Sequence, residues 1–168
     1  MELSRISSNP KIAVDAMGGD FAPTNEVIGA AQASNENPDI EVYLVGRREA
    51  IINVINQNKL KFDFNNIIPA DEVISMGENP TTALRQKPNS SISIGTRLVK
   101  DNKADAFVSA GNTGAVVAAA TLILGRLKNV ERPTIGSYFP NSSGISTVFD
   151  VGAFVDSKPQ HLLSYGIL

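Results

Sequence analysis

The stretch DAFVSAGNTGA, Asp105–Ala115, carries the pattern on which the predicted fold depends. It begins with a run typical of a β-strand and leads into the apolar run Val116–Leu124, which predicts a helix. Between the two runs, Ser109–Gly114 holds two glycines, an asparagine and a threonine. This composition predicts a tight turn from a strand into a helix that begins near Thr113 or Gly114.

The start of this helix has two interpretations. The first backbone N–H groups of a helix have no partner inside it, and they carry a partial positive charge. Asn112 or Thr113 can cap these groups internally. Alternatively the groups bind an anion, and Gly111 and Gly114 allow its close approach. The apolar helix behind the turn is expected to be buried between neighbours, which would hold the turn rigidly.

The same alternation of strands and helices extends outward from this stretch. Strands with continuous apolar residues are predicted over residues 11–17, 40–46, 67–68 and 105–111. Helices are predicted over residues 22–34, 47–58, 81–86, 91–102 and 113–127, with another beginning at residue 159. Two further strands, over residues 134–140 and 146–154, are expected to form a hairpin around residues 141–144. The pattern predicts an α/β fold with a mainly parallel sheet that is covered on both faces.

Ligands of parallel sheets bind beyond the carboxyl ends of the strands. The loops Asp15–Asp20, Gly46–Arg48, Ser109–Gly114 and Asp150–Asp156 are therefore expected to share one edge and form one site. Asp150 and Gly152 are placed on this edge by the strand that precedes them.

The composition excludes several classes of protein. The 168 residues are 42% hydrophobic and 19% charged, with a net charge of −2 and no cysteine. These values indicate a globular chain without disulfides or a basic nucleic-acid surface. We expect a tail over residues 1–10 and one α/β domain over residues 11–168. No signal peptide is recognised, the apolar run 115–124 is too short for a bilayer, and a soluble, cytoplasmic protein is expected.

Several polar residues outside the central turn are candidates for chemistry. In DAMGGD, Asp15 and Asp20 flank Gly18 and Gly19 and can bind a metal, accept a proton or hold the amides of their own loop. The last role is the commonest, and no His or Glu lies at ligand spacing, so no metal is expected.

Three further side chains can be interpreted either as surface residues or as functional residues. Arg85 and Lys87 can reach a phosphate or form a solvated surface pair. His161 is expected to be a surface or packing histidine, with a general base as the alternative.

Four motifs in this order resemble one family: KIAVDAMGGD, SMGENPTTALRQKPNSSI, DAFVSAGNTGA and DVGAFVDSKPQHLL. From Lys11 to about Leu163 the chain resembles the bacterial phosphate acyltransferases of phospholipid synthesis. The resemblance implies a three-layer α/β/α fold like those of phosphate acetyltransferases and the isocitrate and isopropylmalate dehydrogenases. It also implies acyl transfer from acyl carrier protein to inorganic phosphate, giving an acyl phosphate that a membrane glycerol-3-phosphate acyltransferase uses. A homodimer, no cofactor and a cytoplasmic location, with peripheral membrane association as a further expectation, complete the implied picture.

The chain departs from the family pattern in three respects. Family members are longer, so the chain is expected to be an N-terminal half. Phe154 stands where the family usually has Asn, and Ser157 where it usually has Cys. An inactive remnant that binds phosphate or dimerises is therefore the alternative hypothesis. A nicotinamide-linked dehydrogenase of related fold is a third, but the G-x-G-x-x-G spacing is missing.

The expected mechanism needs no covalent intermediate, because phosphate is itself a nucleophile. The protein has to hold phosphate near the thioester carbonyl and stabilise the oxyanion that develops. The residues expected to serve catalysis are Asn112, Thr113, Arg85 and Lys87, with His161 as a weaker candidate. The residues expected to bind substrate are Asp15, Gly18, Gly19, Asp20, Ser109, Gly111, Gly114, Asp150 and Gly152. The clusters Arg47–Arg48 and Arg126–Lys128 are expected to meet the acidic carrier protein or to be solvated surface charge.

Overall fold

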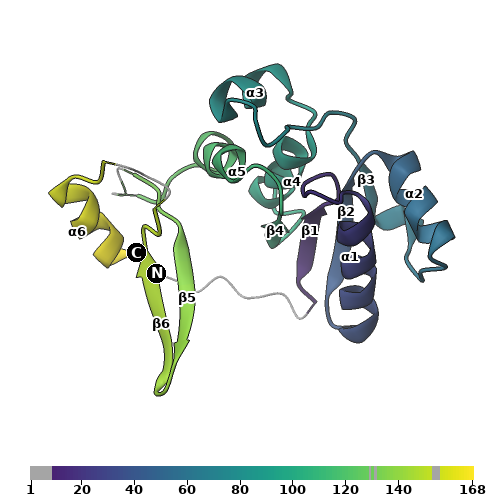
Figure 1. The fold of residues 1–168 in the computed structure, drawn as a ribbon, viewed down its shortest axis with the longest axis horizontal. Coiled ribbons are helices and arrows are strands. Elements are labelled where there is room, and N and C mark those ends of the chain that lie inside the picture. Colours follow the sequence, from purple (N-terminus) through teal and green to yellow (C-terminus); the bar gives the residue numbers. More distant parts are fainter. Residues whose placement is uncertain (1–8, 129, 131, 153–155) are drawn as a thin grey trace. The chain divides into compact units, whose positions relative to one another are not determined.

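The computed structural model of the chain describes residues 9–128, 130, 132–152 and 156–168. It divides into two compact units, Met1–Leu124 and Gly125–Leu168 (Figure 1). The first unit contains a parallel sheet with its helices, and the second contains an antiparallel hairpin and a helix. The single domain expected over residues 11–168 stays a prediction.

The first unit is built on four parallel strands in the order β3-β2-β1-β4. The strands are β1 (Lys11–Asp15), β2 (Glu41–Gly46), β3 (Ile67–Pro69) and β4 (Ala106–Val108). Asp15 is in register with Val45, and Val14 with Val108, so β1 and its two neighbours end at the same edge. The predicted parallel sheet is confirmed.

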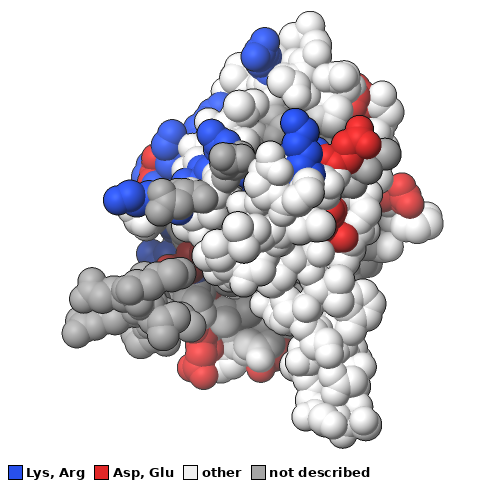
Figure 2. Space-filling view, turned by 90° about the vertical axis from the view of Figure 1, so that its left-hand side faces the viewer, with Lys and Arg blue, Asp and Glu red and all other residues white. Residues whose placement is uncertain are grey.

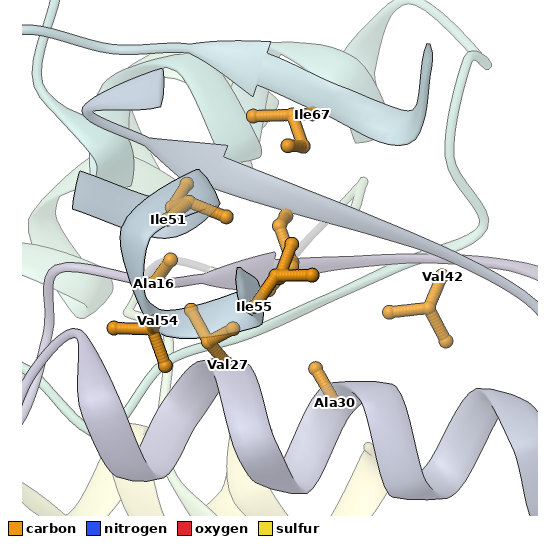
Figure 3. Close-up of a cluster of buried hydrophobic side chains, with 9 residues drawn as sticks. Ala16, Val27, Ala30, Val42, Ile51, Val54, Ile55 and Ile67 are labelled. Atoms are coloured by element: carbon orange, nitrogen blue, oxygen red, sulfur yellow. The ribbon is translucent and has the colours of Figure 1, made fainter. Parts of the chain in front are cut away.

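One face of this sheet is covered by α1 (Thr24–Glu36) and α2 (Arg48–Gln57). Val27 and Ala30 on α1 and Ile51 on α2 pack against apolar strand residues such as Val42 (Figure 3). These side chains recur at the helical spacing of three and four residues, so each helix buries one stripe. Burial of this stripe is the main stabilisation of this layer.

The opposite face is covered by α4 (Ser91–Lys100). Ala13 and Val45 on the strands lie in one buried cluster with apolar residues of α4. Gly95 allows α4 to lie close to the sheet, because a Cβ at this position would be 2.2 Å from Cε2 of Phe107. With helices on both faces, the predicted α/β layering is confirmed.

Two further helices, α3 (Pro80–Gln86) and α5 (Thr113–Ala119), pack with α4 in a third cluster. The helix after the central turn was expected to be buried all round over residues 113–127, and this expectation is wrong. The α-helix ends at Ala119, and a π-helical turn, η2 (Ala120–Leu124), follows it. Ala115 and Ala119 are buried against α3 and α4, but Leu122 is 59% and Leu124 48% exposed. Among the described residues, α5 and η2 therefore pack against neighbours over only part of their surface.

The first unit also contains a 3-10 turn, η1 (Phe64–Asn66), just before β3. The second unit contains β5 (Gly136–Asn141), β6 (Gly144–Phe149) and α6 (Pro159–Ile167). Strands β5 and β6 form the predicted hairpin, with Gly136 opposite Phe149 and Asn141 opposite Gly144. β6 does not join the parallel sheet, so the expectation that Asp150–Asp156 follows a strand of that sheet is wrong.

The hairpin exposes apolar side chains and carries no charge. Residues 136–149 include no Asp, Glu, Lys, Arg or His, and the hairpin is the white arm at the bottom of Figure 2. Tyr138 is 77% and Ile145 71% exposed. Cross-strand register places both side chains on one face of the ribbon, since Tyr138 lies opposite Thr147 and Ile145 opposite Pro140.

The outer edge of β6 is also unprotected. The N–H of Asp150 donates to the carbonyl of Ile135 directly opposite, at 3.0 Å. Hydrogen-bonded and non-bonded pairs alternate in an antiparallel ladder. Ile145, Thr147 and Phe149 therefore direct their backbone groups away from β5, and no third strand pairs with them in the described parts of the chain. Such an edge is a template for pairing with another chain.

We predict that the 168-residue chain self-associates through this hairpin. Thr147→Lys should reduce the association constant at least about tenfold, because a charge on an edge strand opposes edge-to-edge pairing. Light scattering at increasing protein concentration measures the association. Ser142→Lys, which adds the same charge in the exposed turn of the hairpin, is the matched control. Equal association of both variants would show that another surface is responsible.

Candidate functional site

Three segments that follow strands of the parallel sheet come together at its carboxyl edge. The loop Asp15–Asp20 follows β1, the loop Ser109–Gly114 follows β4, and the segment 71–79 follows β3. The first two loops are direct neighbours because β1 and β4 pair in the sheet. The expectation that these two loops share one edge is confirmed. Gly46–Arg48 follows β2, which pairs with β1, so this loop also lies at the carboxyl edge.

Asp15 connects the first two loops. Its carboxylate is buried, with 1% of the residue exposed. Oδ1 accepts a hydrogen bond from the N–H of Met17 at 3.0 Å, and Oδ2 accepts one from the hydroxyl of Ser109 at 2.8 Å. The Ser109 oxygen in turn accepts the N–H of Gly111 at 3.0 Å. Of the roles considered for Asp15, holding the amides and hydroxyl of its own site fits this geometry.

Gly18 lets the two loops touch. A Cβ on Gly18 would lie 2.3 Å from Oδ2 of Asp15 and 2.9 Å from the nitrogen of Gly111. A Cβ on Gly111 would in turn lie 3.1 Å from Cα of Gly18. The distances at Gly18 are too short for a real Cβ, and the distance at Gly111 is tighter than most real Cβ contacts, so the close approach of the two loops requires Gly18 and is eased by Gly111.

Asn112 ties the third segment to the other two. Its Oδ1 accepts the N–H of Ala115 at 3.0 Å and so caps α5. Its Nδ2 lies 3.0 to 3.3 Å from the carbonyl oxygens of Ser75, Met76 and Glu78. The side chain, with 6% of the residue exposed, is thus engaged at both ends. Of the two interpretations of the central turn, internal capping by Asn112 is the one that this side chain adopts.

Capping leaves several backbone donors unused. Within the described parts of the chain, the N–H groups of Asn112, Thr113 and Gly114 donate to no other residue. The same holds for Gly18, Gly19 and Asp20 in the adjacent loop. Backbone N–H groups gathered in this way favour an anion, because each needs an acceptor and together they present positive partial charge.

The two predicted cations differ in their surroundings. Lys87 donates to Oε2 of Glu78 at 2.7 Å and to the carbonyl of Val73 at 2.8 Å, so it anchors the third segment. Arg85 lies in the last turn of α3, is exposed, and forms no ion pair with any residue that the structure describes. Arg47, at the end of β2, donates to the carbonyl of Asp71 at 3.2 Å.

Two residues of this site were not foreseen. Glu26 lies in the first turn of α1, and a Cβ on Gly19 would be 2.1 Å from its Oε1. Its Oε2 is buried and has no hydrogen-bond partner in the described chain. Glu78 is the second, through its ion pair with Lys87. A signal for Glu26 exists in the sequence, since a glutamate in the first helical turn often reaches back toward the residues before the helix.

The remaining predicted residues lie in the second unit. Asp150, with φ of 64°, accepts the hydroxyl of Ser157 at its Oδ2 at 2.6 Å. Gly152 has φ of 89°, a conformation that glycine favours. Nδ1 of His161 accepts the N–H of Lys158 at 3.2 Å, so this histidine stabilises the start of α6. Phe154 lies outside the described residues.

The described residues contain no cluster of three or more His, Cys, Asp or Glu side chains suited to a metal ion. None of their helices combines the length and the apolar character that crossing a bilayer requires.

The parallel sheet and the loops at its carboxyl edge define an α/β protein of the type that binds ligands beyond its strand ends. Its fold is similar to that of a phosphotransacetylase from Streptococcus pyogenes, with a TM-score of 0.73 and 20% identity over 96% of this chain and 52% of that one.

The sequence gives the family. A sequence model described as "Fatty acid synthesis protein" matches residues 10–168, and the chain belongs to this family. The phosphate acyltransferase of Halothermothrix orenii is 46% identical over 158 residues, which cover 94% of this chain and 47% of that protein. The phosphate acyltransferase of Salinibacter ruber is 48% identical over 157 residues, 92% of this chain and 46% of that protein. The chain thus spans about half the length of these curated relatives.

We predict that the ion pair of Glu78 and Lys87 stabilises the site in a pH-dependent way. The hydrogen bond from Lys87, aided by the N–H of Ser75, lowers the pKa of Glu78 below its ordinary value of 4.5. Stabilisation is therefore complete above pH 4.5 and is lost as the pH falls through the lowered pKa.

Urea unfolding of the wild type and of Glu78→Gln measures this effect. The variant should be less stable at pH 7, and the difference should shrink below pH 4.5. Glu36→Gln removes an exposed negative charge that forms no ion pair with the described residues, and it controls for net charge. A Glu78→Gln difference that stays constant from pH 7 to pH 3 would contradict the prediction.

Proposed function

We propose that the chain contributes to the transfer of a fatty acyl group from acyl carrier protein to inorganic phosphate. The observation that carries the proposal is the gathering of unpaired backbone N–H groups from the loops Asp15–Asp20 and Ser109–Gly114. Membership of the fatty acid synthesis protein family and relatives named phosphate acyltransferase support the choice of reaction.

The proposed chemistry makes one bond and breaks one. An oxygen of hydrogen phosphate attacks the thioester carbonyl, and the C–S bond breaks as the acyl phosphate forms. The proton of hydrogen phosphate passes to the departing thiolate, so that the products are acyl phosphate and a free thiol. No covalent enzyme intermediate and no cofactor is needed, and the protein supplies position and electrostatic stabilisation.

Roles for the individual residues follow from their surroundings. The amides of Asn112, Thr113 and Gly114 are proposed to bind phosphate or the developing oxyanion. Arg85, with an exposed guanidinium, is proposed to neutralise phosphate charge. Lys87 and the Asn112 side chain are engaged within the protein and are proposed to act by holding the loops. In the second unit, Asp150 and Gly152 remain candidates for substrate binding, and His161 remains a candidate for catalysis.

The proposed reaction also suggests the partners of the chain. Acyl carrier protein, inorganic phosphate and a membrane glycerol-3-phosphate acyltransferase that uses the product fit this reaction. A homodimer is a further proposal, supported by the exposed hairpin edge. A cytoplasmic location, with peripheral membrane association, completes the proposal.

A second candidate function is binding without turnover. The chain spans about half the length of the curated relatives, so the described loops can bind phosphate while the residues needed for acyl transfer lie elsewhere. Measurement of both binding and turnover separates the two candidates.

We predict that inorganic phosphate binds through a backbone amide at Thr113. Thr113→Pro removes this N–H at the first position of α5, where proline is tolerated. Asn112 has φ of −60° and ψ of 105°, a conformation compatible with a following proline. A hydrogen bond to a charged group contributes about 1.5–3 kcal/mol, so the dissociation constant should rise about tenfold or more.

Calorimetric titration with phosphate measures the change. Thr113→Ala is the matched variant, since it keeps the N–H and removes the hydroxyl. Weaker binding by Thr113→Pro alone assigns the contact to the backbone. An equal loss in both variants would assign it to the hydroxyl, and unchanged binding in both would remove this loop from the phosphate site.

We also predict that acyl phosphate formation depends on Arg85 more than on Lys87 or His161. Arg85→Ala should lower kcat/KM about tenfold, because the cation is free to meet a phosphate dianion. Acyl phosphate is measured with acylated carrier protein and phosphate as substrates. Lys103→Ala, which removes an exposed cation at the amino end of β4, controls for net charge. A larger loss in His161→Ala would reverse the ranking, and no turnover by the wild type would favour binding alone.

A further inference from the structure

The hydrogen-bond chain that joins Gly111, Ser109 and Asp15 has a fixed direction. An ionised carboxylate can only accept hydrogen bonds, so the single Ser109 hydroxyl proton must point at Oδ2 of Asp15, 2.8 Å away. The Ser109 oxygen then has only lone pairs to offer to the N–H of Gly111, 3.0 Å away. The three groups therefore form one directed chain from the backbone of one loop to a buried side chain of the other.

The burial of Asp15 makes this chain costly to break. A carboxylate removed from water needs a hydrogen-bond partner for each oxygen, because an unsatisfied buried charge is strongly unfavourable. Among the described residues no cation pairs with Asp15. Its partners are the N–H of Met17 and the hydroxyl of Ser109. Ser109 is thus the only side chain of the described structure that compensates this carboxylate.

The same chain of hydrogen bonds also determines which backbone amides of the loop Ser109–Gly114 have no acceptor within the described residues. It engages the N–H of Gly111 and leaves the N–H groups of Asn112, Thr113 and Gly114 without an acceptor in the described parts of the chain. Gly18 lies close to this peptide on the other side, since a Cβ on Gly18 would be 2.9 Å from the Gly111 nitrogen.

We infer that Asp15 and Ser109 are positioning residues: by holding the N–H of Gly111, they fix the backbone of Ser109–Gly114 in the orientation that offers the following amides to an oxyanion. This inference rests on the proposed phosphate site, and it changes the expected role of both side chains from substrate contact to support of the loop. In the described structure, the Asp15 carboxylate and the Ser109 hydroxyl both form their hydrogen bonds with groups of these loops.

The decisive variants are Ser109→Ala and Ser109→Thr. Ser109→Ala removes the link, so the Gly111 amide should exchange its hydrogen about fivefold to tenfold faster, measured residue by residue by NMR in the folded chain. The dissociation constant for inorganic phosphate should rise by a similar factor. Ser109→Thr keeps the hydroxyl and should restore both values to within about twofold of the wild type.

Asp15→Asn tests the hydrogen bond between Ser109 and Asp15. An asparagine has one acceptor oxygen and an amide donor in place of the second oxygen, so the hydrogen bond that Oδ2 accepts from the Ser109 hydroxyl is lost or is replaced by one donated in the opposite direction. The effects of Asp15→Asn and Ser109→Ala on Gly111 exchange should be strongly non-additive, since each removes the same interaction. Thr96→Val is the control: it removes a buried hydroxyl that donates to Ile92 within α4, and it should lower thermal stability without changing Gly111 exchange or phosphate affinity.

The outcomes separate this inference from the proposed function. Faster Gly111 exchange together with weaker phosphate binding in Ser109→Ala, both restored by Ser109→Thr, supports the inference. Unchanged Gly111 exchange in Ser109→Ala overturns it, as does an equal effect of Thr96→Val. If the wild type binds no phosphate, the proposed phosphate site is wrong. Gly111 hydrogen exchange and the double-mutant cycle then still show whether Asp15 and Ser109 fix the backbone of Ser109–Gly114. If phosphate binds and Ser109→Ala changes exchange but not affinity, the positioning role is overturned.

Discussion

The candidate site depends on a single buried carboxylate. Asp15 ends β1, is almost fully buried, and accepts hydrogen bonds from its own loop and from Ser109 after β4. The two residues are 94 positions apart in the chain, and only the pairing of β1 with β4 brings them together. Since an uncompensated buried charge would oppose folding, the sheet pairing and the loop arrangement stabilise one another. The site is therefore assembled by the same contacts that complete the sheet.

A second support holds the loop after β4 from the other side. Asn112 caps α5 and at the same time donates to the segment that follows β3. Lys87 and Glu78 fix that segment further through their ion pair. The turn between β4 and α5 is thus held at Ser109 and at Asn112, and the backbone between them has little freedom. Such preorganisation is what an oxyanion site requires, because donors that are already oriented need no reorganisation during the reaction.

The two units differ in how they are stabilised. The first buries apolar stripes on both faces of its sheet, with α1 and α2 on one side and α4 on the other. The second has an uncharged hairpin with exposed apolar side chains and an edge on β6 with which no other described strand pairs. A two-stranded hairpin by itself is marginally stable in water. The relatives are about twice as long as this chain, and the first unit carries the parallel sheet and the candidate anion site within residues 11–124.

The sequence by itself determined the order and type of the elements, because their signals are local. Apolar runs, helical periodicity and glycine turns predicted the parallel sheet, its helices and the hairpin, and the turn after β4 was recognised from its composition. Burial of the whole apolar run after this turn was predicted wrongly, because Leu122 and Leu124 are exposed, and an apolar sequence alone does not show how many neighbours it packs against. The roles of Asp15, Asn112 and Lys87, and the presence of Glu26, were decided only by the tertiary structure. Each of these depends on a partner distant in the sequence or on the direction of a side chain. The sequence alone shows neither, because both arise only when the chain folds.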